Sequence, residues 1–270
     1  MTEEIVQMER PDGHPVSFGG LQAQGLTVKA GTATLVEAAS FTLQAGELVA
    51  LLGPNGAGKT SLLRGAIGLA PRATGWARID GEDTAEMAPR RRARHLAYLP
   101  QNRPLAWPNP VRDVVALGRF SYGAALGRLR GDDRRAVERA LAACDLERLA
   151  KRSTATLSGG ELARVHCARA FAAEAPLLIA DEPVAELDPY HQFRVMDLVK
   201  AFVGRGGGAL VVLHDVVLAR RYADRFIWMK GGRIVADGTP AATLSARRLA
   251  DIYGVRGRVD GARVELEGPL

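Results

Sequence analysis

The sequence predicts an α/β fold with a parallel core sheet, and three observations lead to this expectation. Continuous apolar runs of strand length occur at 48–52, 175–180 and 209–213, as expected for strands buried on both faces of a sheet. A helical pattern at 192–203 joins the second run to the third, and the order strand–helix–strand produces parallel neighbours. Each run is far shorter than the roughly 20 apolar residues of a membrane span, so we expect no transmembrane helix.

Before the first run, the chain has the alternating pattern of half-buried strands. Apolar and polar residues alternate at 21–28 and 38–43, and the segment 75–79 reaches an Asp-Gly pair at 80–81, which is a strong hairpin signal. These strands predict an antiparallel flank near the N-terminus. The preceding residues 1–20 contain several prolines and glycines and predict a loosely attached lead-in.

The middle of the chain is predicted to be helical. Amphipathic patterns cover 111–118, 132–150 and 161–174, so residues 102–174 predict a helical subdomain inserted between strands. Around this insertion, helical and strand patterns alternate. Helices are expected at 59–69 and 83–94, and strands at 95–99, 177–180, 226–229 and 233–235, with a closing hairpin at 255–266.

Composition excludes several classes of protein. Apolar residues make up 47% of the 270 residues and charged residues 24%, which excludes a disordered chain and allows a sizeable core. Cys144 and Cys167 stand outside any C-x-x-C pair, so a disulfide framework is excluded and a reducing cytoplasm is expected. The acidic, polar start at 1–10 is unlike a secretory signal. The net charge of +6 is compatible with a nucleic-acid or membrane-surface partner, or with a general preference for arginine.

The strongest local motif matches the G-x-x-x-x-G-K-[ST] phosphate loop, between an apolar strand and an amphipathic helix. Its glycines let the loop curl so that successive backbone N–H groups face one anion, and the helix N-terminus adds partial positive charge there. Lys59 is expected to bridge the β- and γ-phosphates, Thr60 to bind Mg²⁺ and Ser61 to contact the α-phosphate. The motif predicts a P-loop NTPase. The predicted nucleotide-binding residues are Gly53, Pro54, Asn55, Gly56, Ala57, Gly58, Lys59, Thr60 and Ser61.

Two adjacent carboxylates, Asp181 and Glu182, follow the buried strand pattern at 177–180. Ligands of open parallel sheets bind at the carboxyl ends of the strands, where this pair is expected to lie. Because adjacent residues of a strand point to opposite sides, the two carboxylates can take different roles. We expect Asp181 to hold Mg²⁺, directly or through water, and Glu182 to polarise the attacking water.

The pentapeptide at 157–161, Leu-Ser-Gly-Gly-Glu, comes directly before a helical pattern. Ser158 is a suitable N-cap, and the two glycines expose backbone N–H groups at a helix start, where anions bind. Taken alone, the motif is better explained as an ordinary helix cap. Its place between the phosphate loop and the acidic strand favours a functional role.

The phosphate loop, the pentapeptide and the acidic strand follow one another along the chain in the order found in the ATP-binding cassette ATPases. The sequence resembles this family over about residues 20–255. Besides the motifs described above, the family pattern matches Gln101 after Leu99-Pro100, Glu186-Leu187-Asp188, and His214 after an apolar strand. The resemblance implies a head-to-tail dimer that sandwiches two ATP molecules. Each ATP is then held between the phosphate loop of one protomer and the signature pentapeptide of the other.

The resemblance also implies roles for single residues. The catalytic residues that it implies are Lys59, Gln101, Glu182 and His214, of which His214 contacts the γ-phosphate and positions the water. The Mg²⁺ ligands that it implies, direct or through water, are Thr60, Gln101 and Asp181. The residues that it implies at the nucleotide from across the dimer are Ser158, Gly159, Gly160 and Glu161, with Asp188 signalling between the protomers. One position departs from the pattern, because Ala30-Gly31 stands where the family usually has an aromatic residue that stacks on adenine.

These patterns divide the chain into five expected parts. The parts are a flexible lead-in (1–20), the N-terminal part of an ATP-binding core with the antiparallel β flank (21–101), a helical subdomain with the signature (102–174), the C-terminal part of the core (175–254) and a tail hairpin (255–270).

Two segments, 111–119 and 249–255, are similar to those of the ATPases of iron-siderophore, haem and vitamin B12 importers. The expected function is therefore that of the ATPase subunit of an importer, which couples Mg-ATP hydrolysis in a homodimer to uptake of a metal chelate. The expected partners are separate transmembrane permease subunits and, indirectly, an extracytoplasmic substrate-binding protein. The expected location is peripheral, at the cytoplasmic face of the inner membrane.

The alternative is a non-transport ABC ATPase of the iron–sulfur assembly or DNA repair type. The basic charge motivates the repair interpretation, which salt-sensitive DNA binding would support. However, the sequence has no sustained heptads of the kind that such relatives carry, and the arginines within 90–94 fit a solvated helix face. No nucleic-acid partner is therefore expected.

Overall fold

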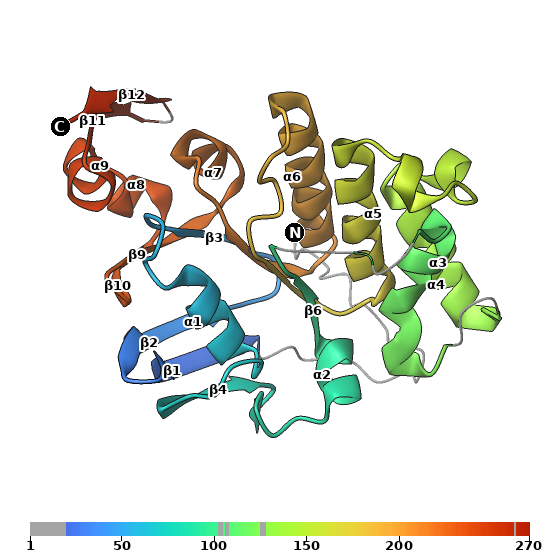
Figure 1. Ribbon diagram of the computed structural model, residues 1–270. Coiled ribbons are helices and arrows are strands. Elements are labelled where there is room, and N and C mark those ends of the chain that lie inside the picture. Colours follow the sequence, from blue (N-terminus) through green and yellow to red (C-terminus); the bar gives the residue numbers. More distant parts are fainter. Residues whose placement is uncertain (1–19, 102–104, 106–107, 125–127, 262) are drawn as a thin grey trace, which may run out of the picture.

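A six-stranded sheet forms the centre of the computed structural model, which describes residues 20–101, 105, 108–124, 128–261 and 263–270 (Figure 1). The strand order is β10-β9-β3-β8-β7-β6. Its strands are β3 (Leu48–Leu52), β6 (Leu96–Leu99), β7 (Leu177–Ala180), β8 (Gly208–Val212), β9 (Arg225–Lys230) and β10 (Arg233–Gly238). Neighbours from β9 to β6 are parallel, and β10 pairs antiparallel with β9. The predicted parallel core sheet is confirmed.

A second sheet of four antiparallel strands lies beside the first, in the order β2-β1-β4-β5. Its strands are β1 (Leu21–Ala30), β2 (Ala33–Leu43), β4 (Thr74–Ile79) and β5 (Glu82–Asp83). Helix α1 (Lys59–Ala66) packs between the sheets, because Leu26 of β1, Leu63 of α1 and Val49 of β3 share one buried cluster. The predicted N-terminal antiparallel flank is therefore confirmed, whereas residues 1–19 of the expected lead-in lie outside the described residues.

Helices make up most of the described chain between β6 and β7. They are α3 (Val111–Ala116), the 3-10 helix η1 (Leu117–Tyr122), α4 (Gly131–Ala143), the 3-10 turns η2 (Glu147–Leu149) and η3 (Thr154–Thr156), and α5 (Gly159–Ala172). They form a group of their own at one side of the central sheet (Figure 1). Their shared core includes Val115 of α3, Val137 of α4 and Val165 of α5.

Two of these helices differ from the sequence prediction. The helix expected at 132–150 ends as α4 seven residues early, because the chain turns at Asp145, whose φ of 53° is left-handed. The α-helix expected at 111–118 ends at Ala116, and the chain continues directly as the 3-10 helix η1. There, a Cβ on Gly118 would lie only 2.2 Å from the carbonyl oxygen of Arg169, so η1 and α5 approach more closely than any larger residue allows.

The remaining elements surround the six-stranded sheet. They are α2 (Pro89–His95), α6 (Pro189–Gly204), α7 (Val216–Tyr222), α8 (Pro240–Thr243), α9 (Ala246–Tyr253), β11 (Val255–Asp260) and β12 (Arg263–Pro269). The last two strands form the hairpin expected near the C-terminus. Within the described residues, no helix has the length and apolar character needed to cross a membrane.

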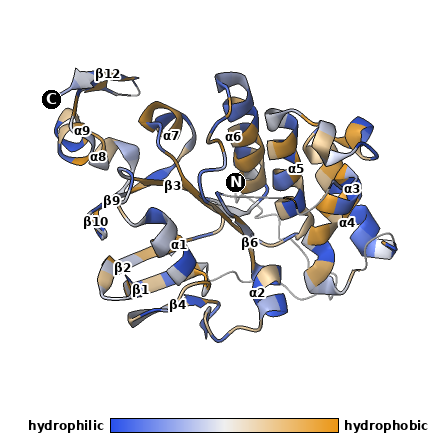
Figure 2. Ribbon diagram, viewed as in Figure 1, coloured by the Kyte–Doolittle hydropathy of each residue, from blue (hydrophilic) through white to orange (hydrophobic). Residues whose placement is uncertain are grey.

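The strands of the central sheet are among the most apolar parts of the fold (Figure 2). Strands β3, β7 and β8 are buried along their whole length. This burial explains why the sequence pattern there is continuous rather than alternating. The sheet is therefore a rigid base from which the loops at its carboxyl edge project.

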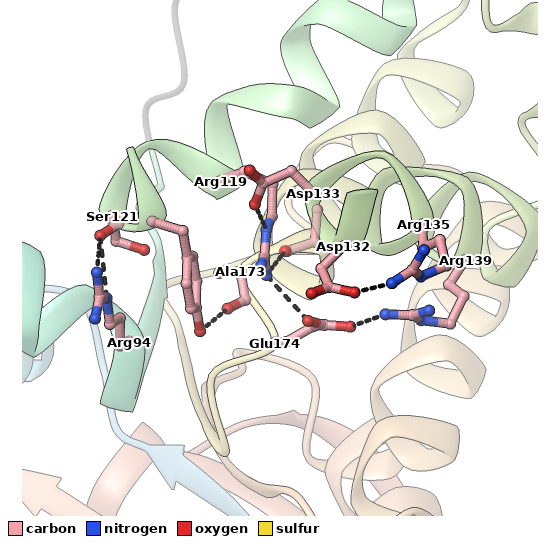
Figure 3. A network of polar contacts seen from close by, with 11 residues as sticks. Arg94, Arg119, Ser121, Asp132, Asp133, Arg135, Arg139, Ala173 and Glu174 are labelled. Carbon is pink, nitrogen blue, oxygen red and sulfur yellow. Dashed lines mark hydrogen bonds and ion pairs between the residues drawn. The ribbon is translucent and has the colours of Figure 1, made fainter. Parts of the chain in front are cut away.

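A buried arginine holds the helical group together (Figure 3). Arg119 of η1 is only 1% exposed, and its Nε donates to Asp133 Oδ1 of α4 over 2.9 Å. Its Nη1 donates over 3.0 Å to the carbonyl oxygen of Ala172, the last residue of α5, and over 3.0 Å to Glu174 Oε2 just beyond that helix. The guanidinium also lies 3.7 Å from the centre of the Tyr122 ring. One side chain thus joins three helices.

The same region attaches the helical group to the rest of the molecule (Figure 3). Arg94 of α2 donates through Nε and Nη2 to the carbonyl oxygen of Ser121, over 3.0 and 2.8 Å. Tyr122 donates its hydroxyl proton to the carbonyl oxygen of Ala173 over 3.1 Å. Because η1 accepts hydrogen bonds from α2 and donates others to the end of α5, its position depends on both elements together.

Replacing Arg119 by methionine is expected to lower the free energy of unfolding by about 2–3 kcal/mol, because Asp133 and Glu174 lose a buried cationic partner. Urea denaturation followed by tryptophan fluorescence measures the change. The control is Arg112→Met, since the ion pair of Arg112 with Glu138 is exposed and its loss should cost less than about 0.5 kcal/mol. Equal losses in the two variants would contradict the proposed role of Arg119.

Candidate functional site

The phosphate-loop sequence follows β3 directly and leads into α1, as the sequence predicted. Two of its glycines are required by close backbone approaches. A Cβ on Gly53 would lie 2.3 Å from the carbonyl oxygen of Met229, and one on Gly58 would lie 2.4 Å from that of Leu35. Gly58 also caps α1 with a left-handed φ of 95°. The loop therefore packs closely against the backbones of β9 and β2. Only glycine, which has no Cβ, fits at these two positions of the loop.

Lys59 is the cation of this loop, and it is 6% exposed. Its Nζ donates to the carbonyl oxygens of Gly53 and Pro54, over 2.7 and 2.9 Å. Burial lowers the pKa of Lys59, and the negative charges of Glu182 and Asp181 oppose that shift. The ammonium group is thus held inside its own loop by neutral carbonyls, which a phosphate can replace as a stronger, charged acceptor.

Thr60 and Asp181 come together beside the loop. Thr60 Oγ1 donates to Asp181 Oδ1 over 3.3 Å, and Asp181 is 1% exposed. Its Oδ2 is buried and has no hydrogen-bond partner among the described residues. Burial raises the pKa of Asp181, since the charged form loses contact with water. A hydroxyl next to a carboxylate with a free oxygen is a ligand set that suits Mg²⁺.

Glu182 points to a different pair of groups. Its Oε2 accepts a hydrogen bond from Gln101 Nε2 over 2.8 Å, and its Oε1 lies 2.6 Å from His214 Nε2. Gln101 follows β6, Glu182 follows β7 and His214 follows β8, so three parallel strands bring these side chains to one edge. Glu182 has a φ of 51°, in the left-handed region. Such a backbone conformation is unfavourable for glutamate and is typical of functional sites.

The signature pentapeptide forms the start of α5. Ser158 Oγ accepts from the backbone N–H of Glu161 over 3.2 Å, and Glu161 Oε2 accepts from the N–H of Ser158 over 2.8 Å. This reciprocal cap explains why α5 begins earlier than the predicted 161. The hydrogen bond from the Ser158 N–H lowers the pKa of Glu161. Ser158 and Gly159 are exposed, so the N-terminus of the helix faces solvent beside the cap.

Asp188 caps α6 next to the signature. Its Oδ1 accepts from the backbone N–H of His191 over 2.9 Å. The ring of His191 lies against Gly160, where a Cβ would come within 2.3 Å of it. This place of His191 could not be predicted from the sequence, because a lone histidine carries no pattern. The structure brings Asp188 and the signature together through that ring.

The two halves of the expected site remain separate within one chain. Among the described residues, no hydrogen bond or ion pair joins the phosphate loop to Ser158 or Glu161. Another contact of the loop was not expected from the sequence: the Gly53 N–H donates to Tyr253 Oη over 3.1 Å. Ala30 ends β1 at an exposed turn and brings no ring to the site.

The chain is similar to known proteins in sequence and in fold. A family model described as ABC transporter matches residues 36–185. A hemin import ATP-binding protein from Pseudomonas entomophila is 41% identical over 240 residues, which cover 87% of this chain and 92% of that protein. One from Nocardia farcinica is 41% identical over 238 residues, or 86% and 82% of the two chains. A dimeric ATP-binding cassette solved in a post-hydrolysis state with ADP and Pi has a TM-score of 0.71 at 27% identity, covering 81% of this chain and 98% of that chain.

Replacing Lys59 by alanine is expected to raise the dissociation constant for ATP by about ten- to a hundredfold, because charge-assisted bonds to the phosphates are lost. Isothermal titration calorimetry measures the constant. The control is Lys200→Ala, which removes a surface cation paired with Asp224 and should leave the constant unchanged. If Lys59→Ala bound ATP as tightly as the native protein, Lys59 would not be a phosphate ligand.

Proposed function

Because this chain belongs to the ABC transporter family, we propose that it is the ATPase subunit of an importer whose cargo is haem. Membership of this family makes the protein an ATP-hydrolysing transport ATPase. The cargo rests on one observation: the relatives at 41% identity, which match more than four fifths of the chain, are named for hemin import. Haem is one of the metal chelates expected from the sequence. The iron–sulfur assembly and DNA repair alternatives are not favoured.

The residues beside the phosphate loop fit a bound Mg²⁺. Thr60 Oγ1 and the unpartnered Oδ2 of Asp181 are hard oxygen ligands at one place. Gln101 donates to Glu182 through its nitrogen, so its amide oxygen is the atom left to face the cation. Bound there, Mg²⁺ would supply positive charge to the β- and γ-phosphates.

The remaining groups have complementary roles in hydrolysis. Lys59 exchanges the carbonyl oxygens of its own loop for phosphate oxygens, which places its charge where negative charge develops. Glu182 accepts the proton of the attacking water as a general base. Its other oxygen stays with His214, and that contact orients the carboxylate. Gln101 and His214 thus position Glu182 from two neighbouring strands.

A head-to-tail homodimer completes the site in this proposal. Within one chain the exposed start of α5 is not bonded to the phosphate loop, so a second protomer is needed to bring Ser158 and its helix N-terminus to the γ-phosphate. The resemblance to a dimeric cassette with ADP and Pi supports this assembly. His191 lies against Gly160 and donates its backbone N–H to Asp188, so this pair is placed to signal between the protomers whether a nucleotide is bound at Gly160.

An open groove offers a docking place for the permease. It has a volume of about 700 Å³ and lies where α2 of the core meets η1 of the helical group, and its lining residues are Pro89, Arg90, Ala93, Phe120, Ser121, Gly123 and Ala124. Phe120, which is 47% exposed, lies in this groove beside Pro89 and Ala93, and contiguous apolar surface of this kind marks a site of protein interaction. We infer that transmembrane permease subunits dock here, at the cytoplasmic face of the inner membrane, and that an extracytoplasmic binding protein supplies the cargo.

Replacing Glu182 by glutamine is expected to slow ATP hydrolysis by about 10²–10⁴-fold while ATP binding persists, because the amide cannot accept the proton of water. Phosphate release measures the rate, and size-exclusion chromatography with MgATP is expected to show a trapped dimer. Glu138→Gln, at a surface ion pair, is the control and should hydrolyse ATP normally. Near-normal hydrolysis by Glu182→Gln would refute the assigned role.

Haemin uptake into vesicles that contain a haem-type permease and this ATPase tests the proposed function. Native protein should support ATP-dependent uptake, whereas Phe120→Asp should lose uptake and co-purification, since a charge in the groove opposes apolar docking. Its ATPase rate without permease should be unchanged. Leu69→Asp, at another exposed apolar side chain, is the control and should transport normally. Uptake of a different chelate but not of haemin would contradict haem as the cargo. Association with a soluble partner and with no permease would contradict the proposed role in transport.

A further inference from the structure

Gly53, the first residue of the phosphate loop, is restrained on three sides. Its carbonyl oxygen accepts from Lys59 Nζ over 2.7 Å, and its Cα faces the carbonyl oxygen of Met229. Its N–H donates to Tyr253 Oη over 3.1 Å. Tyr253 is the last residue of α9, so this bond joins the nucleotide site to the C-terminal part of the fold.

Tyr253 is itself held in place. Its ring packs edge-on against Trp228, with ring centres 6.2 Å apart, and Trp228 is fully buried. Directly after it, Gly254 ends α9 with a left-handed φ of 67°, and its carbonyl oxygen accepts from the N–H of Leu270. The hairpin β11–β12 therefore folds back onto the end of α9. Burial raises the pKa of Tyr253 to about 12, so the hydroxyl stays neutral.

We propose that Tyr253 is a positioning residue that keeps the phosphate loop in its ATP-binding shape and links ATP affinity to the C-terminal unit of α9 and its hairpin. This inference rests on the loop being the ATP site. The roles of Lys59 and Tyr253 differ when ATP binds. Lys59 must leave the carbonyl oxygens of Gly53 and Pro54 to reach the phosphates, whereas the Tyr253 bond can remain.

The effect on affinity follows from the backbone freedom of glycine. Without the Tyr253 bond, Gly53 can adopt other backbone conformations at little steric cost, since it has no Cβ. The fraction of molecules with a competent loop then falls, and the apparent dissociation constant rises by the inverse of that fraction. Once ATP is bound, the catalytic groups at β6, β7 and β8 are unaffected. Tyr253 should therefore influence KM far more than kcat.

The test is Tyr253→Phe, which keeps the ring against Trp228 and removes the hydroxyl. The dissociation constant and KM for MgATP are expected to rise about three- to tenfold, the range for one lost neutral hydrogen bond, with kcat nearly unchanged. Tyr222→Phe is the matched control. Tyr222 is buried and its pKa is likewise raised to about 12, but its hydroxyl donates to Asp197 Oδ1 over 2.7 Å, between α7 and α6. Its loss can lower stability but should leave the constant for MgATP unchanged.

Amide hydrogen exchange of the peptide that contains Gly53 gives a second readout. We expect faster exchange at Gly53 in Tyr253→Phe than in the native protein or in Tyr222→Phe, without ATP. An unchanged dissociation constant, or a fall in kcat alone, would overturn the proposal. So would an equal rise in both variants, which would indicate a general loss of stability. If native protein did not bind MgATP, the ATP site itself would be wrong, which is a separate failure.

Discussion

The carboxyl edge of the six-stranded sheet is the constraint on which the candidate site depends. Parallel strands end at one edge, so β3, β6, β7 and β8 deliver their following loops to the same place. Thr60 and Asp181 meet there although 121 positions separate them. The flanking sheet and the helices bury β3, β7 and β8 along their whole length, which makes the edge rigid. The side chains of the site therefore keep fixed positions relative to one another, although each has a different chemical role.

The charges at this edge form an incomplete set. Lys59 faces Asp181 and Glu182, and burial lowers the pKa of the lysine and raises that of Asp181. A triphosphate adds further negative charge next to two carboxylates, which the Lys59 ammonium and the Arg64 guanidinium that acts on Asp181 cannot balance. Mg²⁺ at Asp181 and a helix N-terminus from a second protomer would both supply the missing positive potential. The proposed cation and the proposed dimer thus answer the same electrostatic need.

Much of the fold could be predicted because its signals are local. Continuous apolar runs identified the buried strands, and glycine spacing identified the phosphate loop. The contacts that escaped prediction join distant residues of ordinary type. Tyr253 reaches Gly53 across 200 positions, His191 fills the space beside Gly160, and Arg119 is buried although arginine is usually exposed. No periodicity or spacing marks such residues, since only the folded chain brings their partners to them.

Helix α5 gives the proposed docking groove a physical route to the nucleotide. Its 14 residues span about 20 Å as a rigid rod. At its C-terminal end, the carbonyl oxygen of Ala172 is bonded to Arg119, the residue before Phe120 in the groove. At its N-terminal end, the reciprocal cap of Ser158 and Glu161 fixes the backbone that is proposed to face the γ-phosphate. We therefore propose that a permease segment that displaces η1 would also displace α5 and Ser158, and that closure around ATP would move the groove in return.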